Sequence, residues 1–309
     1  MKAMFLNETG GPEKLVYGDA PEPEAGEGEV LIRVHATAVT PTEFDWFPTW
    51  KTATQAPRPF PIILSHEFSG VVAACGPGVT DLGVGDAVYG LNDWFRNGAQ
   101  AECCVARAAE LSPKPQSLDH IHAAVVPISA LTAWQGLFDR GGLRAGQRVL
   151  IHGAAGGVGS FATQLAHWRG AHVIATASAH NLAFVRSLGA DEVVDYKATR
   201  FEDVAHDVDL VFDTVGGETL ARSWALLKAG GKLVTVAAAS EPATDPRVRD
   251  SFFIVEPRRA QLREIASLID GGHLQAIVEA VLPLSEARQA YARARQGGMR
   301  GKIVLRVAS

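Results

Sequence analysis

Two hydrophobic periods follow each other along the chain. Over residues 29–40, EVLIRVHATAVT, apolar and polar residues alternate, which places one apolar set on a common face: Ile32, Val34, Ala36 and Ala38. A period of two is typical of a half-buried strand. Similar short runs at 68–79, 84–90 and 99–106 are separated by Gly, Pro and Asp, as tight turns require. The pattern predicts a compact β-barrel-like domain with a few short helices over residues 1–121.

The middle of the chain changes to apolar strands that alternate with helices. Strands are predicted at 147–152, 172–177, 192–195, 209–214 and 232–237. Helical spacing is found between them, at 158–170, 181–189 and 218–231. Repeated strand–helix–strand units with wholly apolar strands indicate a parallel sheet that is covered on both faces. Right-handed crossovers then predict an α/β class, with a doubly wound dinucleotide-binding fold.

The glycine-rich stretch GAAGGVG, residues 153–159, joins a predicted strand to a predicted helix. Free backbone N–H groups and the helix dipole at such a junction favour an anion. Gly156, Gly157 and Gly159 would let the backbone approach a pyrophosphate and let the helix pack tightly on the strand. The alternative is a structural turn without a ligand. The strand–turn–helix context favours a dinucleotide site.

The residues after the second strand indicate which dinucleotide binds. An NAD-selective site has an acidic residue about 20 positions beyond the glycine turn, and here no acid occurs before Asp191. Ser178 could donate to a 2′-phosphate instead, with His180 nearby as a cation. Ser178 could also simply cap the next helix, or do both. The sequence favours NADPH.

Composition and charge limit the cell compartment and the kinds of partner that we expect for the protein. Its three cysteines are an odd number with two adjacent, Cys103 and Cys104, so they form no disulfide framework and a reducing cytoplasm is expected. A net charge of −5 gives no general attraction to nucleic acid or to an anionic membrane. The N-terminus does not resemble a signal peptide, and no apolar run approaches the roughly 18 residues of a membrane span.

Eight segments, in order and spacing, resemble the medium-chain dehydrogenase/reductase superfamily in its zinc-independent quinone oxidoreductase (zeta-crystallin-like) branch. They are GEVLIRVHATAV, GDAVYG, LTAWQGL, GQRVLIHGAAGGVG, SLGADEVVDY, DLVFDTVGG, GGKLVTV and GKIVL. The resemblance implies a GroES-like β-barrel catalytic domain built from both chain ends, 1–121 and 260–309. A Rossmann dinucleotide-binding domain, 122–259, would be inserted between them. It also implies a homodimer.

The resemblance implies a set of cofactor-binding residues: Thr132, Ala155, Gly156, Gly157, Val158, Ser178, Tyr196, Val215, Ala238 and Phe253. The glycine turn would hold the pyrophosphate, Ser178 and Tyr196 the 2′-phosphate, and the others the ribose and nicotinamide. Val215 and Phe253 could equally be core residues. Many relatives have a Lys three residues after the serine, where this chain has Asn181.

The stretch LSHEFSG, residues 64–70, contains His66 and Glu67, which look like half of a metal site. A catalytic zinc needs three protein ligands and an open position. In zinc-dependent relatives two cysteines complete the set, but the matching positions here are Thr40 and Ile128. No catalytic zinc is therefore expected. Without a Lewis acid, alcohol oxidation is disfavoured, whereas quinones and α,β-unsaturated carbonyls need only positioning and a hydrogen bond to their oxygen.

Three residues are candidates for that hydrogen bond or for a proton: Thr40, Tyr89 and His66. Thr40 stands where the family often has an Asn. Tyr89 could instead be a half-buried aromatic of the barrel, and His66 a structural histidine. The predicted function is NADPH-dependent reduction of a small quinone or enone. The alternatives are an enoyl or alkenal (C=C) reductase, and a non-catalytic NADPH-binding protein.

Overall fold

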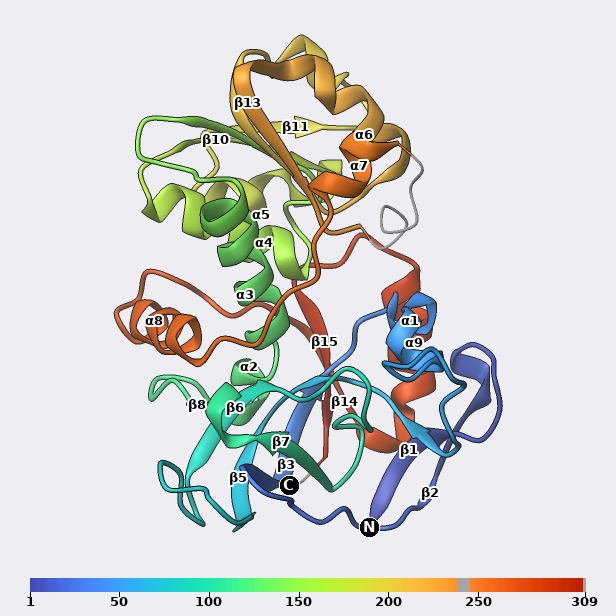
Figure 1. The fold of residues 1–309 in the computed structure, drawn as a ribbon. Helices are drawn as coiled ribbons and strands as arrows, with labels where there is room; N and C mark the ends of the chain where they lie inside the picture. The colour runs from blue at the N-terminus through green and yellow to red at the C-terminus, as the bar shows by residue number, and fades with distance from the viewer. Residues whose placement is uncertain (238–244, 308–309) are drawn as a thin grey trace.

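The computed structural model describes residues 1–237 and 245–307. Figure 1 shows two regions, one above the other, with both chain termini in the lower one. The lower region carries the blue N-terminal strands together with the red C-terminal strands. The upper region contains the middle of the chain.

The lower region is built on a seven-stranded sheet with the order β14-β15-β3-β5-β6-β8, and β7 pairs with β3. Its strands are β3 (Glu29–Ala38), β5 (Glu67–Cys75), β6 (Ala87–Leu91), β7 (Cys103–Arg107), β8 (Ser112–Pro113), β14 (Val278–Pro283) and β15 (Lys302–Arg306). A three-stranded sheet lies beside it, formed by β1 (Lys2–Leu6), β2 (Leu15–Asp19) and β4 (Ile62–Ile63). The predicted alternation of β3 is confirmed, except that Thr37 is also buried, where its hydroxyl donates to the carbonyl of Glu67 over 2.6 Å.

The C-terminus returns to this sheet. β15 pairs antiparallel with β3 and parallel with β14. Its residues Ile303 and Leu305 are fully buried in a cluster with Leu6 and Tyr291. The C-terminal segment thus joins the same sheet as the N-terminal strands, as the resemblance implies, and it places Lys302 at the boundary between the two regions.

The upper region holds a parallel sheet with the order β11-β10-β9-β12-β13. The bounds are β9 (Arg148–Ile151), β10 (His172–Ala177), β11 (Glu192–Asp195), β12 (Val208–Asp213) and β13 (Leu227–Thr235). Helices α4 (Gly157–Trp168), α5 (Leu182–Ser187) and α6 (Gly217–Ser223) connect the strands. This arrangement confirms the doubly wound α/β prediction.

One predicted boundary is wrong. The helix expected over 218–231 ends at Ser223, and β13 already begins at Leu227, which pairs with Val208. Gly230 has a φ of +78° within this strand, and the ladder shifts register there. The glycine pair interrupts the hydrophobic alternation, so the first half of the strand carries no pattern that the sequence could reveal.

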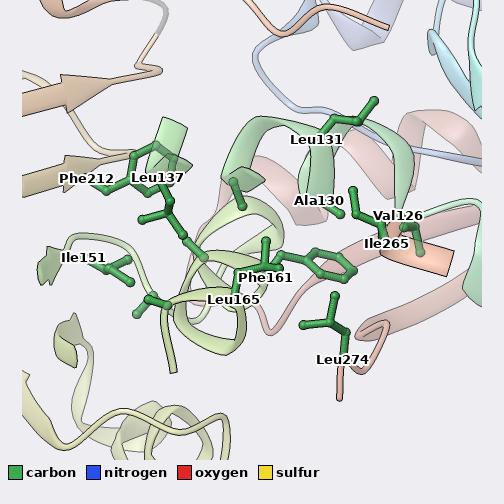
Figure 2. Packing of buried hydrophobic residues seen from close by; sticks show 14 of the residues in the cluster. Val126, Ala130, Leu131, Leu137, Ile151, Phe161, Leu165, Phe212, Ile265 and Leu274 are labelled. Atoms are coloured by element: carbon green, nitrogen blue, oxygen red, sulfur yellow. The ribbon is translucent and has the colours of Figure 1, made fainter. Parts of the chain in front are cut away.

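A hydrophobic core connects the Rossmann sheet to the helices that face the lower region. Figure 2 shows Phe161 and Leu165 of α4 packed among Ile151 of β9, Phe212 of β12 and Ile265 of α8 (Arg259–Asp270). The further helices are α1 (Phe47–Trp50), α2 (His120–Ala123), α3 (Pro127–Trp134), α7 (Pro246–Ser251), α8 (Arg259–Asp270) and α9 (Ala287–Arg295). This packing fixes α4, and with it the glycine turn at its start.

Among the helices that the structure describes, none is both long and apolar enough to cross a membrane.

Candidate functional site

A cavity of about 590 Å³ lies where the two regions meet. Its lining comes from segments far apart in the sequence: the glycine turn 153–159, the residues after β10 and β12, Thr40, and the segment 297–302. Ligands of doubly wound sheets bind at the carboxyl ends of the strands, and this cavity lies there.

The glycine turn leaves no room for side chains at two positions. A Cβ on Gly159 would lie 2.2 Å from the carbonyl oxygen of Gly153, and one on Gly157 would lie 2.8 Å from Cγ of Lys302. Gly153 itself has a φ of +70°. Since α4 begins at Gly157, its first N–H groups lie at the cavity wall. The turn therefore fits the pyrophosphate of a dinucleotide, with backbone donors and a helix N-terminus together.

Ser178 and Tyr196 both line the cavity, after β10 and β11 respectively. Ser178 is buried, whereas Tyr196 is largely exposed. Asn181 Nδ2 lies 3.5 Å from Ser178 Oγ and 3.2 Å from the carbonyl oxygen of Gly298. Arg300 Nε donates to Asn181 Oδ1 over 2.8 Å. Asn181 thus ties the segment 297–301 to the edge of the cavity.

Thr40 lines the other part of the cavity, together with Lys302. The Lys302 ammonium donates to Thr40 Oγ1 over 2.9 Å and forms an ion pair with Glu67 Oε1. Glu67 is fully buried, and its second oxygen accepts the backbone N–H of Ile128 over 2.8 Å. Burial raises the pKa of the Glu67 carboxyl, while the Lys302 charge opposes that rise.

The residues present do not fit a zinc ion. His66 Nδ1 lies 2.7 Å from Glu43 Oε1, and Nε2 lies 3.2 Å from the carbonyl oxygen of Arg96. Both oxygens of Glu67 are engaged as described, and Thr40 and Ile128 stand where two cysteines would be needed. Within residues 1–237 and 245–307, no three His, Cys, Asp or Glu side chains form a group that could hold a metal ion.

Two of the three candidate donors, Tyr89 and His66, lie outside the cavity lining. Tyr89 is fully buried, its hydroxyl donates to the carbonyl of Leu262 over 2.6 Å, and burial raises the pKa of its phenol. The Tyr89 hydroxyl therefore makes its hydrogen bond inside the core, and Tyr89 does not line the cavity. His66 is also buried, and its two ring nitrogens face Glu43 and Arg96. Of the three, the structure brings only Thr40 to the cavity.

Some of the predicted cofactor residues line the cavity and others do not. Those that line the cavity are Ala155, Gly156, Gly157, Val158, Ser178, Tyr196 and Val215. Thr132 lies in the buried part of α3, and Phe253 is a core residue with the Arg140 guanidinium 5.6 Å from its ring centre. Neither belongs to the lining. Ala238 lies outside the described residues.

Sequence reasoning missed several lining residues, among them Lys302, Ser129 and His152. Ser129, on α3, is 1% exposed, and in the described part of the chain its Oγ has no hydrogen-bond partner. A buried hydroxyl without a partner at a cavity wall is a place for a ligand acceptor. His152 is held by Thr176 and Ser223, and burial lowers its pKa to about 4, so its ring adds no charge to the cavity at neutral pH.

A barrel region and a Rossmann sheet that share one cavity, with a glycine turn shaped for a pyrophosphate, define a dinucleotide-dependent oxidoreductase. Two family models match the chain. The alcohol dehydrogenase GroES-like domain matches residues 26–116, and a model described as zinc-binding dehydrogenase matches residues 188–305.

Individual proteins match over nearly the whole chain. A protein of Arthroderma benhamiae named "probable zinc-binding oxidoreductase, mitochondrial" is 35% identical, over 93% of this chain and 91% of its own length. The chloroplastic NADPH-dependent alkenal/one oxidoreductase of Arabidopsis thaliana is 33% identical, over 99% and 79%. The solved structure of a quinone oxidoreductase from Coxiella burnetii superposes with a TM-score of 0.91 at 31% identity, over 100% and 99%.

The chain belongs to the medium-chain dehydrogenase/reductase superfamily, in its quinone oxidoreductase type. It is an oxidoreductase, and the cavity fits the nicotinamide dinucleotide that this class of enzyme uses.

Proposed function

We propose that the protein is an NADPH-dependent oxidoreductase that reduces a quinone or an α,β-unsaturated carbonyl without a catalytic zinc. One observation carries the proposal. A single cavity is lined by the glycine turn, by Ser178 and Tyr196, and by the Thr40 hydroxyl. A dinucleotide held at the first two would bring its nicotinamide end towards the third.

The preference for NADPH is supported by the end of β10. The strand ends at Ala177, and a serine follows it where an NAD-selective site would have a carboxylate for the ribose 2′-hydroxyl. Ser178 can donate to a 2′-phosphate, and no acidic residue follows before Asp191 to repel it. The Arabidopsis relative is named for its use of NADPH.

Independence from zinc is supported by the donor set, although one family model and one relative carry zinc in their names. Of the four positions compared, only His66 and Glu67 bear a metal-binding side chain, and both make other contacts. A reaction without a Lewis acid then needs an acceptor that is already activated by conjugation.

The bound cofactor would supply a hydride, and the chain's own groups would orient the cofactor and bind the substrate oxygen. The turn and α4 orient the dinucleotide through backbone N–H groups. The Thr40 hydroxyl lies where it can donate a hydrogen bond to a carbonyl oxygen as negative charge develops on it. The proton that completes the reduction comes from solvent or from a side chain at the cavity.

A C=C reductase is the second candidate, because the Arabidopsis relative is named an alkenal/one oxidoreductase. Both reactions place negative charge on the same oxygen, so the cavity suits either one. Product analysis separates them: a saturated carbonyl identifies C=C reduction, and a hydroquinone identifies quinone reduction. A protein that binds NADPH and turns over neither class would instead be a non-catalytic binder.

We expect the purified protein to oxidise NADPH with a quinone or an enone at a kcat/KM at least about 10-fold higher than with NADH. The reason is that the Ser178 hydroxyl can donate a hydrogen bond to the 2′-phosphate, a group that NADH lacks. As a neutral side chain, Ser178 does not repel that phosphate as a carboxylate would. Absorbance at the reduced nicotinamide band measures both rates on one substrate panel. A preference for NADH would contradict the cofactor assignment, and no turnover on any substrate would contradict the catalytic proposal.

We extend the proposal to a homodimer in the cytoplasm that acts on a small molecule. The compartment is supported by the cysteines: Cys75, Cys103 and Cys104 are all free thiols. Light scattering of the purified protein would test the homodimer, and fractionation of cells that make the protein would test its cytoplasmic location. A monomer, or a protein recovered from an organelle, would contradict the corresponding proposal.

A further inference from the structure

Lys302 occupies an unusual place for a lysine. It is only 7% exposed at the start of β15, and it also lines the cavity. Its stem packs on the glycine turn, since a Cβ on Gly157 would lie 2.8 Å from Lys302 Cγ and 3.1 Å from its Cδ. The backbone beside it is fixed as well, because Gly301 N–H donates to the carbonyl of Ala155 over 2.9 Å. The ammonium is therefore held at one spot between the turn and Thr40.

The ion pair with Glu67 also holds the Lys302 ammonium in place. Glu67 is fully buried on β5, and the N–H of Ile128 holds its other oxygen over 2.8 Å. A buried ion pair contributes little to stability in comparison with apolar residues of the same volume. Its presence at the cavity wall therefore calls for a reason other than folding.

The contact between Lys302 and Thr40 gives such a reason. A lysine ammonium has only donors, so in the 2.9 Å contact between Lys302 Nζ and Thr40 Oγ1 the threonine oxygen must accept. A threonine hydroxyl has one proton of its own, and that proton then has to point away from the lysine. Because Thr40 lines the cavity, its proton is left for a ligand there.

We propose that Lys302, held by Glu67, is a positioning residue that fixes the Thr40 hydroxyl as a hydrogen-bond donor to the substrate oxygen. This inference rests on the proposed function and deepens it. The lysine acts through Thr40 and polarises that hydroxyl, which strengthens the bond it donates. Without the lysine, the hydroxyl would be free to rotate and would spend part of its time in other orientations.

A double-mutant cycle tests this coupling. The proteins are the wild type, Lys302→Met, Thr40→Val and the double variant, each measured for kcat and KM with a quinone and for the Kd of NADPH by fluorescence. We expect Lys302→Met to lower kcat about 10-fold in the wild-type background, and by no more than about 2-fold when Thr40 is already Val. The Kd for NADPH should stay within about 2-fold. Lys228→Met, which removes the exposed partner of Asp209, is the matched control and should change none of these values.

The outcomes separate the possible roles. An equal loss of kcat in both backgrounds would overturn the inference, since the lysine would then act independently of Thr40. A large rise in the Kd of NADPH with kcat unchanged would overturn it too, and would make Lys302 a cofactor ligand. If Lys302→Met does not fold, the cycle is run with Lys302→Met combined with Glu67→Gln, which removes both buried charges together. A wild type without turnover would overturn the proposed function itself, whereas an active wild type with additive losses would overturn only this inference.

Discussion

Replacing Thr40 with Val is expected to lower kcat about 100-fold, because the substrate oxygen loses its hydrogen-bond donor at the step where charge develops on it. Valine has nearly the same volume as threonine, so the cavity keeps its size. The Kd for NADPH should not change, since the glycine turn and Ser178 are untouched. Steady-state rates with a quinone, together with a fluorescence titration of NADPH, measure the two quantities separately.

Thr42→Val is the control for this experiment. Thr42 is exposed two residues further along the chain, and the same chemical change there should leave kcat unaltered. If Thr40→Val turned over at the wild-type rate, Thr40 would have no part in the reaction. A loss of NADPH affinity of the same size as the loss of kcat/KM would make Thr40 a cofactor contact rather than a substrate contact.

Replacing Gly159 with Ala is expected to weaken NADPH binding by about 100-fold or more and to destabilise the protein by about 1–3 kcal/mol. A Cβ there would lie 2.2 Å from the carbonyl oxygen of Gly153, which is backbone and cannot move aside without shifting the turn. The shift would misplace the N–H groups at the start of α4. Fluorescence titration gives the affinity, and urea unfolding gives the stability.

Gly83→Ala is the matched control, because Gly83 is exposed and a Cβ there would have its nearest neighbour at 4.0 Å. It should behave as the wild type in both measurements. An unchanged NADPH affinity in Gly159→Ala would mean that the turn does not hold the pyrophosphate. The dinucleotide would then have to bind elsewhere in the cavity.

The sequence allowed the Rossmann sheet to be predicted because its strands are short, wholly apolar and separated by amphipathic helices. Strands β9 to β12 begin and end within a residue or two of the predicted ranges. The glycine turn was equally visible, since its residue type and its strand–helix context carry the chemistry. β13 escaped prediction in part because Gly230, at a positive φ, interrupts its pattern.

The Thr40 side of the cavity is harder to predict because it depends on contacts between distant segments. Tyr89 is a candidate by residue type, but only the structure shows that its hydroxyl donates a hydrogen bond to the carbonyl of Leu262, 173 residues away. Lys302 reads from the sequence as the surface end of a strand. Its meeting with Glu67 and Thr40 depends on β15 returning to β3, and nothing local in the chain encodes that contact.

Reduction without a metal is the central claim, and metal analysis joined to turnover tests it most directly. The protein, purified without chelators, should contain far less than one zinc per chain by mass spectrometry. Its rate of NADPH oxidation with a quinone should be the same before and after dialysis against a strong chelator. Near-stoichiometric zinc, with a rate that falls on chelation and returns when zinc is added, would contradict the claim.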